Sequence, residues 1–141
     1  MQTIPNWSSY EDTEGDCKGA AAVSIKRVLG DRFILKAEVK IKPAVPHGRG
    51  ARLDMALFDP ATYKMLLIIE VKRRASSRAW KQGMRYADLT GVPVIYLNGM
   101  AECEQAGERI AQVLQLDLAQ PAAVPAVRVF RPPSLDPDKA A

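Results

Sequence analysis

Metal-binding and disulfide-forming residues are scarce in this chain. Its 141 residues include two cysteines, Cys17 and Cys103, which form no CxxC pair, and a single histidine, His47. A zinc site built from thiolates and imidazoles therefore lacks ligands, and a disulfide framework lacks cysteines. Any metal ion that this chain binds is expected to be a hard cation held by oxygen atoms.

Long apolar runs and an export signal are also missing. No apolar stretch approaches the roughly 20 residues that span a bilayer, and the N-terminus, MQTIPNWSS, has neither the cationic start nor the apolar core of a secretory signal. We therefore expect a cytoplasmic protein without a membrane partner. The apolar fraction of 48% is that of a globular protein. It predicts one domain over residues 1–120 and a proline- and alanine-rich tail over 121–141, with a short edge strand at 127–130 as one option.

The hydrophobic periodicity predicts an α/β fold. We expect elements in the order α-β-β-β-α-β-α, with helices over 17–29, 78–89 and 101–116 and strands over 33–42, 52–58, 64–72 and 92–97. The first three strands are expected to form an antiparallel meander, and the last strand to join by a parallel crossover. The result is a mixed central sheet flanked by helices. In the first strand, alternation predicts one inward row of Phe33, Leu35, Ala37, Val39 and Ile41.

Three charged residues stand where an apolar sheet is expected. Glu70 and Lys72 lie two apart at the end of a nearly continuous apolar strand, so they share a face, and normal pairing of the meander places Asp54 beside them. Two carboxylates brought together in this way suit Mg²⁺, and an adjacent lysine can orient water and stabilise charge on phosphorus. The alternative is a solvated ion pair that merely ends the strand. Because burying such charges is costly, their position favours function.

A basic stretch follows directly. The residues from Lys72 to Arg85 include no acidic side chain, and the whole chain carries a net charge of +4, so a polyanionic partner fits. The alternative is a solvated helix face. Trp80, within this stretch, is expected to pack on the sheet, with stacking on a base as the alternative. The residues expected to contact nucleic acid are Arg73, Arg74, Arg78, Lys81, Arg49 and Arg52.

These motifs resemble a known family of nucleases. The segment RLDMALFDPATYKMLLIIEVK is similar to the core of PD-(D/E)xK, or restriction-endonuclease-like, nucleases, with Leu53-Asp54 where that signature has Pro-Asp and Glu70-Val71-Lys72 where it has (D/E)xK. The signature proline, which Leu53 replaces, carries no chemistry. The following KQGMRY resembles the QxxxY motif of the RecB-type branch, at Gln82 and Tyr86. The resemblance extends over residues 14–98.

The resemblance implies a restriction-endonuclease-like core and a role for each matched residue. Asp54 and Glu70, with the backbone carbonyl of Val71, would hold Mg²⁺ or Mn²⁺, and Lys72 would position the attacking water. An acidic residue on the first helix often assists, and here Glu14 matches best, with Glu11 and Asp16 as alternatives. The remaining members of the implied catalytic set are Gln82 and Tyr86, which would support the geometry of the site.

The function expected from these observations is metal-dependent hydrolysis of DNA phosphodiester bonds. An endonuclease is expected rather than an exonuclease, acting as a homodimer or within a larger DNA-processing complex, because one domain of this size has little surface for recognition. A non-catalytic nucleic-acid-binding module and a partner-dependent subunit of a repair or restriction complex are the alternatives. A structural protein, in which Glu70 and Lys72 form a surface ion pair, is a third.

Overall fold

The order of elements agrees with the sequence pattern. The computed structural model describes residues 13–43 and 48–119, so Glu11, His47 and the strand expected at 127–130 lie outside it. Within these ranges no helix has the length and apolar character needed to cross a membrane. The elements are α1 (Glu14–Leu29), the 3₁₀ turn η2 (Gly30–Arg32), β1 (Ile34–Ile41), β2 (Ala51–Phe58), β3 (Met65–Lys72), α2 (Ser77–Thr90), β4 (Val94–Asn98), α3 (Met100–Glu104) and α4 (Ala106–Val113).

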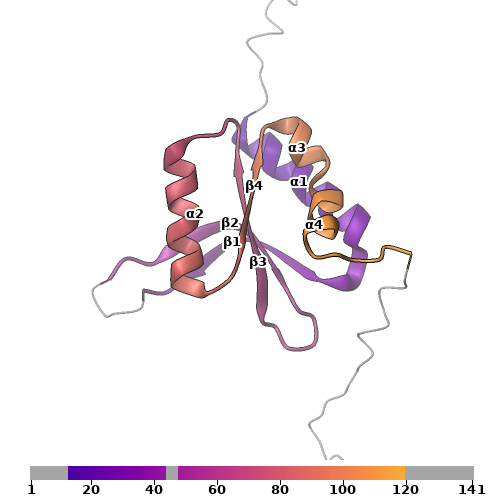
Figure 1. Ribbon diagram of the computed structural model, residues 1–141, viewed down its shortest axis with the longest axis horizontal. Helices are drawn as coiled ribbons and strands as arrows, with labels where there is room; N and C mark the ends of the chain where they lie inside the picture. The colour runs from indigo at the N-terminus through magenta and orange to yellow at the C-terminus, as the bar shows by residue number, and fades with distance from the viewer. Residues whose placement is uncertain (1–12, 44–47, 120–141) are drawn as a thin grey trace, which may run out of the picture.

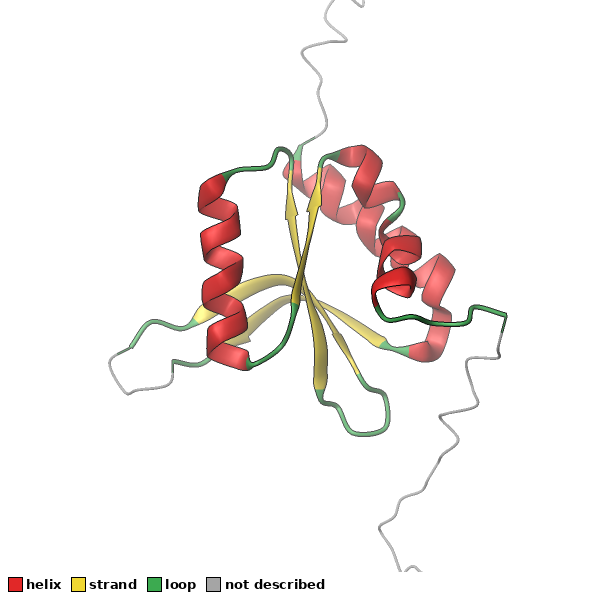
Figure 2. Ribbon diagram, in the orientation of Figure 1, coloured by secondary structure: helices red, strands yellow, loops and turns green. Residues whose placement is uncertain are grey.

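The four strands form one mixed sheet in the order β1-β2-β3-β4. The pairs β1–β2 and β2–β3 are antiparallel, and β3–β4 is parallel. Helix α2 makes the crossover and lies on one face of the sheet, whereas α1, α3 and α4 lie on the other (Figure 1). The layers are clearest in Figure 2, where the helices flank the strands on both sides. The predicted α/β class, with a mixed sheet flanked by helices, is confirmed.

Local signals set the helix ends. The Thr13 hydroxyl accepts a hydrogen bond from the Asp16 amide (3.0 Å), and the Asp16 carboxylate accepts one from the Thr13 amide (2.9 Å), which together form a capping box at the start of α1. Ser76 caps α2 by accepting from the Ala79 amide. Gly91 ends α2 with a φ of 72°, a conformation in which glycine meets no Cβ penalty.

Two apolar clusters lie on opposite faces of the sheet. The larger joins α1, α3 and α4 to the sheet and includes Ile25, Leu57, Ile69 and Ile110. The smaller lies under α2, and its buried members in the described part of the chain are Leu53, Ala56, Ile68 and Tyr86. The central strand β3 contributes to both clusters, as its continuous apolar sequence predicted.

The prediction of one inward row along β1 is wrong. Phe33 and Leu35 pack against the larger cluster, but Val39 and Ile41 pack against the smaller one on the other face. The strand changes face at Glu38, whose φ of 53° is rare for a residue with a side chain. A positive φ breaks the strict alternation of an extended strand, and periodicity in the sequence does not reveal it.

The single helix expected over 101–116 is two helices, α3 and α4, separated at Gln105. The break lets α4 dock closely on α1. Gly107 has no side chain at a point where a Cβ would collide with Val28 and with the backbone of Ser24. The Gly107 amide donates to the Ser24 hydroxyl (2.9 Å), which satisfies a first-turn amide of α4 across the helix contact.

Candidate active site

The site lies where β2 and β3 stop pairing through their backbones. Their antiparallel register ends at Met55 opposite Ile69. Beyond that point side chains bridge the strands. The Asp54 amide donates to Glu70 Oε2 (3.1 Å), and the Val71 amide donates to Asp54 Oδ2 (2.8 Å). The structure therefore brings Asp54 and Glu70 together, with each carboxylate bonded to the backbone of the opposite strand.

Glu70 is a carboxylate in an apolar setting. It is 2% exposed, and it is the one charged residue among the fully buried side chains of the described residues. Burial, and after it the negative charge of Asp54, raises the pKa of Glu70 from 4.5 to about 7. The hydrogen bond from the Asp54 amide and the charges of Lys72 and Lys18 oppose this rise. A proton or a cation at Glu70 would therefore relieve an unfavourable charge.

Lys18 is the site residue that the sequence did not reveal. From the first turns of α1 its Nζ lies 3.1 Å from Asp54 Oδ1 and 3.5 Å from Glu38 Oε2. Burial disfavours the charged form of Lys18, but the hydrogen bond and the charge of Asp54, with the charges of Glu38 and Glu14, raise its pKa. Its only sequence signal is a lysine next to a buried position, Cys17, at the start of an otherwise small and apolar helix.

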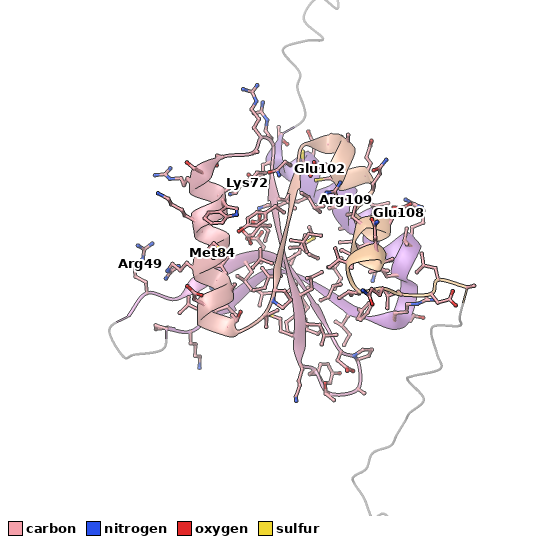
Figure 3. The ribbon with its side chains drawn as sticks, viewed as in Figure 1. Arg49, Lys72, Met84, Glu102, Glu108 and Arg109 are labelled. Atoms are coloured by element: carbon pink, nitrogen blue, oxygen red, sulfur yellow. The ribbon has the colours of Figure 1, made fainter. Side chains whose placement is uncertain are left out.

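Lys72 ends β3 two residues after Glu70, and its positive charge opposes the rise in the pKa of Glu70. Its Nζ is 3.7 Å from Glu14 Oε2, and both side chains are partly exposed. Together with Arg73 and Arg74 these two residues line an open surface pocket of about 390 Å³. Figure 3 shows Lys72 at the end of β3, between α2 and the helices of the opposite face. The pocket is large enough for a phosphate group, and its lining is mainly cationic.

The two residues of the proposed QxxxY motif also belong to this region. Tyr86 is 3% exposed. Burial, and then the charges of Glu70 and Asp54, raise the pKa of the Tyr86 hydroxyl, while a hydrogen bond with the Gln82 side chain lowers it. Tyr96, which the sequence did not single out, pairs in register with Glu70, and its pKa is raised by burial and by the Glu70 charge. Two phenols therefore approach the carboxylates from the α2 side.

The donor atoms fit a hard cation better than a soft one. Asp54 and Glu70 offer carboxylate oxygens, and the two cysteines are buried in the larger apolar cluster. The described ranges contain no group of three acidic, histidine or cysteine residues arranged to hold a metal ion. Magnesium in proteins is commonly held by one or two carboxylates, with water and substrate oxygens as the other ligands. A two-carboxylate site completed by substrate matches that pattern.

The three acidic residues considered as accessory metal ligands at the start of the chain differ in their surroundings. Glu14 pairs with Lys72, near the acidic pair but not in one group with it. Asp16 caps α1, so its carboxylate is already used in the capping box. Glu11 lies outside the described residues. The role of Glu14 as an accessory metal ligand stays a prediction.

The predicted basic contacts belong to different parts of the structure. Arg73 and Arg74 line the pocket at Lys72, and Arg78 and Lys81 are exposed along α2. Arg49 lies beside α2 in Figure 3. Arg52 forms an ion pair with Glu38 (3.3 Å).

The other members of the basic stretch differ from expectation. Arg85 donates to the Arg49 and Gly50 carbonyls (both 3.0 Å), so its guanidinium fastens the end of the β1–β2 loop to α2. The expectation that Trp80 packs on the sheet is wrong, because its side chain is 56% exposed. The buried positions of α2 are taken by Ala79, Gly83 and Tyr86.

Comparison with protein-family models, with curated proteins and with solved structures gives no match to this chain. Membership of the nuclease family therefore stays a prediction. The function is inferred from the arrangement of Asp54, Glu70 and Lys72 and of the side chains around them.

Proposed function

We propose that this chain is a metal-dependent deoxyribonuclease of the PD-(D/E)xK type, with a restriction-endonuclease-like core. It would hydrolyse DNA phosphodiester bonds with water activated by Mg²⁺ or Mn²⁺, as an endonuclease rather than an exonuclease. The observation that carries the proposal is the buried carboxylate of Glu70, which accepts a hydrogen bond from the Asp54 amide across the strands and feels the positive charge of Lys72.

A purely structural reason for this arrangement is weak. Regular pairing with the neighbouring strands of the sheet would satisfy the amides of Asp54 and Val71 through backbone carbonyls, so neither amide needs a carboxylate partner. The chain instead uses two carboxylates for those amides, and the burial of Glu70 disfavours its ionised form. Strained or electrostatically unfavourable groups that persist in a fold are enriched at functional sites. The positive φ of Glu38, whose carboxylate shares Lys18 with Asp54, is a second such feature.

The side chains divide the work as follows. Asp54 and Glu70 would hold the cation, with the Val71 carbonyl and Glu14 as further donors. When bound, that cation would lower the pKa of a coordinated water and withdraw charge from the phosphate. Lys72 forms a partly exposed ion pair with Glu14 and would turn toward a phosphate at the pocket, where its ammonium would stabilise developing negative charge. Gln82 and Tyr86 would hold the acidic pair in place.

The surroundings fit a polyanionic substrate. Arg73 and Arg74 line the same pocket as Lys72, and Arg78 and Lys81 extend the positive charge along α2. Such contacts fix the position of a phosphate backbone without reading its sequence. We propose that a homodimer, or a larger DNA-processing complex, supplies the recognition surface that a single domain of this size lacks.

One observation favours a second candidate, a nucleic-acid-binding module without catalysis. The acidic pair is already compensated within the chain, because Lys18 lies against Asp54 and each carboxylate accepts a backbone hydrogen bond. Such a network needs no metal ion. The two candidates differ in calorimetry, since the nuclease binds Mn²⁺ at Asp54 and the module does not.

The test is cleavage of supercoiled plasmid and linear duplex in Mg²⁺, Mn²⁺ or EDTA by wild type and by Asp54→Asn. The asparagine keeps an oxygen that can accept from the Val71 amide, so the fold should persist while the cation site is lost. Asp88→Asn, an exposed position on α2, is the matched control. Metal-dependent cutting by the wild type and the control, absent in Asp54→Asn, is expected. Equal cutting by Asp54→Asn would overturn the assignment.

A further inference from the structure

An exposed tryptophan stands beside the proposed site. The indole of Trp80 is 56% exposed and the side chain of Met84, one turn later on α2, is 45% exposed. Both lie on the flank of the helix next to its buried row of Ala79 and Gly83. Large apolar side chains at such positions usually complete a core, so an exposed pair on one flank indicates a surface that receives a partner.

The backbone under Trp80 is fixed to the catalytic end of the sheet. The Tyr96 hydroxyl donates to the Trp80 carbonyl (2.9 Å). Its ring packs against Gly83, where any Cβ would overlap the phenol. Tyr96 is in register with Glu70 across the β3–β4 pair. The backbone that carries the indole is therefore fixed to the strand next to Glu70, while the ring itself is open to solvent.

Charge identifies the kind of partner. All charged residues from Lys72 to Arg85 are basic. Arg78 and Lys81, both exposed, lie within two positions of Trp80 in the sequence. Arg73 and Arg74 continue the positive charge to the pocket at Lys72. An apolar ring set among cations complements a polyanion that carries flat apolar groups, which describes a nucleic acid strand. Inside a duplex the base faces are covered by their neighbours, so away from a duplex end only an unpaired base can stack on an exposed indole.

We propose that Trp80 is a base-stacking platform, and that the substrates of this chain are nucleic acids with unpaired nucleotides next to the cleavage point, such as single strands, overhangs or flaps. The inference rests on the proposed nuclease function and narrows its substrate class. Phosphates on either side of the stacked base would meet Arg78 and Lys81, while the strand continues toward Lys72.

Binding without cleavage separates the two proposals. The only other tryptophan, Trp7, is replaced in a Trp7→Phe background, so that the fluorescence reports Trp80 alone. In EDTA, this protein is titrated with a 12-nucleotide single strand and with the blunt duplex of the same sequence. We expect the single strand to quench the fluorescence and to bind with an affinity that Trp80→Ala lowers on the order of tenfold or more, as loss of one base–aromatic stack does.

Matched variants test the specificity of that loss. Trp80→Phe keeps a ring and should retain most of the affinity. Tyr63→Ala removes an aromatic side chain of similar exposure, 66%, from the turn between β2 and β3, and it should change binding less than twofold. Affinity for the blunt duplex should change less than twofold in every variant.

Several results would overturn the inference. They are the absence of quenching, an equal loss of affinity for single strand and duplex, and failure of the parent protein to bind either one. Concentration-dependent self-association in sedimentation velocity that Trp80→Ala abolishes would instead make this flank a contact between copies. Cleavage in Mg²⁺ is scored separately, so a cutting enzyme with an unimportant Trp80 contradicts this inference alone. A chain that binds single strands through Trp80 but never cuts contradicts only the nuclease.

Discussion

The two faces of the sheet differ in the size of the apolar cluster that each one buries. On the face covered by α1, α3 and α4, apolar side chains from three helices and three strands form a continuous buried cluster. On the α2 face, the buried apolar cluster of the described residues is smaller, with Leu53, Ala56, Ile68 and Tyr86, and Trp80 stays exposed. Stability is therefore concentrated on the first face, which leaves the second face and the parted ends of β2 and β3 available for charged side chains.

We expect the largest effect on activity at Lys72, a residue that contributes little to stability. Lys72→Ala should lower cleavage by at least about 10²- to 10³-fold, the usual cost of removing a group that stabilises transition-state charge. The free energy of unfolding should change by less than about 1 kcal/mol, because the ion pair with Glu14 is partly exposed. Lys64→Ala, at the exposed opposite end of β3, is the control for both measurements. Undiminished cleavage by Lys72→Ala would show that Lys72 has no catalytic role.

On the face covered by α1, α3 and α4, we expect a large effect on stability and none on activity. Ile110→Ala in α4 should lower the free energy of unfolding by about 2–5 kcal/mol, because it leaves a cavity among side chains that cannot relax fully. Val113→Ala on the same helix, where the side chain is 57% exposed, should change it by less than about 0.5 kcal/mol. Urea denaturation measures both. Folded Ile110→Ala protein should keep the cleavage rate of wild type. A lower rate in the folded variant would mean that the face covered by α1, α3 and α4 also shapes the site.

The buried carboxylate of Glu70 should make the stability of the fold depend on pH. Its pKa is near 7 in the folded chain and near 4.5 without the fold, so between these values the folded chain binds more protons and stability falls as the pH rises. Glu70→Gln stays neutral throughout. In EDTA the variant should be more stable than wild type above pH 7, on the order of 2–3 kcal/mol, and the difference should vanish below about pH 4.5.

Exposed Glu104 provides the control for that experiment. Glu104→Gln should follow the wild-type stability at every pH, with differences under about 0.5 kcal/mol. Glu70→Gln should also be inactive, since an amide is a poor cation ligand. A variant less stable than wild type at pH 8 would show that the ionised carboxylate stabilises the fold, which contradicts the distinction between a stabilising face and a functional end of the sheet.

The sequence predicted the elements well because their signals are local. Thr13, Ser76 and Gly91 mark helix ends by their own side chains or backbone freedom, and the apolar run of β3 marks the central strand. What escaped prediction depends on contacts between distant segments. The strand β1 changes face at Glu38, which has a positive φ, and the last helix divides at Gln105, after which α4 docks on α1 through Gly107.

The same distinction applies to the site. Asp54, Glu70 and Lys72 could be found because they interrupt apolar strands, and the pairing of two adjacent strands follows from a short turn. Lys18 could not, because its partnership with Asp54 depends on how α1 crosses the sheet. The fate of Trp80 was mispredicted for a related reason. Small residues, Ala79 and Gly83, take the buried positions of α2 and leave the indole outside.

The smallest predicted effect concerns the cationic side of α2. Replacing both Arg78 and Lys81 with alanine should weaken DNA binding and reduce the slope of log affinity against log salt by about 1.8, since each lost phosphate contact removes about 0.9. Lys26→Ala with Arg27→Ala, on exposed positions of α1 on the opposite face, removes the same charge and is the control. If both double variants reduce the slope equally, overall charge governs binding and the α2 face has no special part in it. A reduction confined to the α2 pair would mean that the face with the smaller core is the one that meets the substrate.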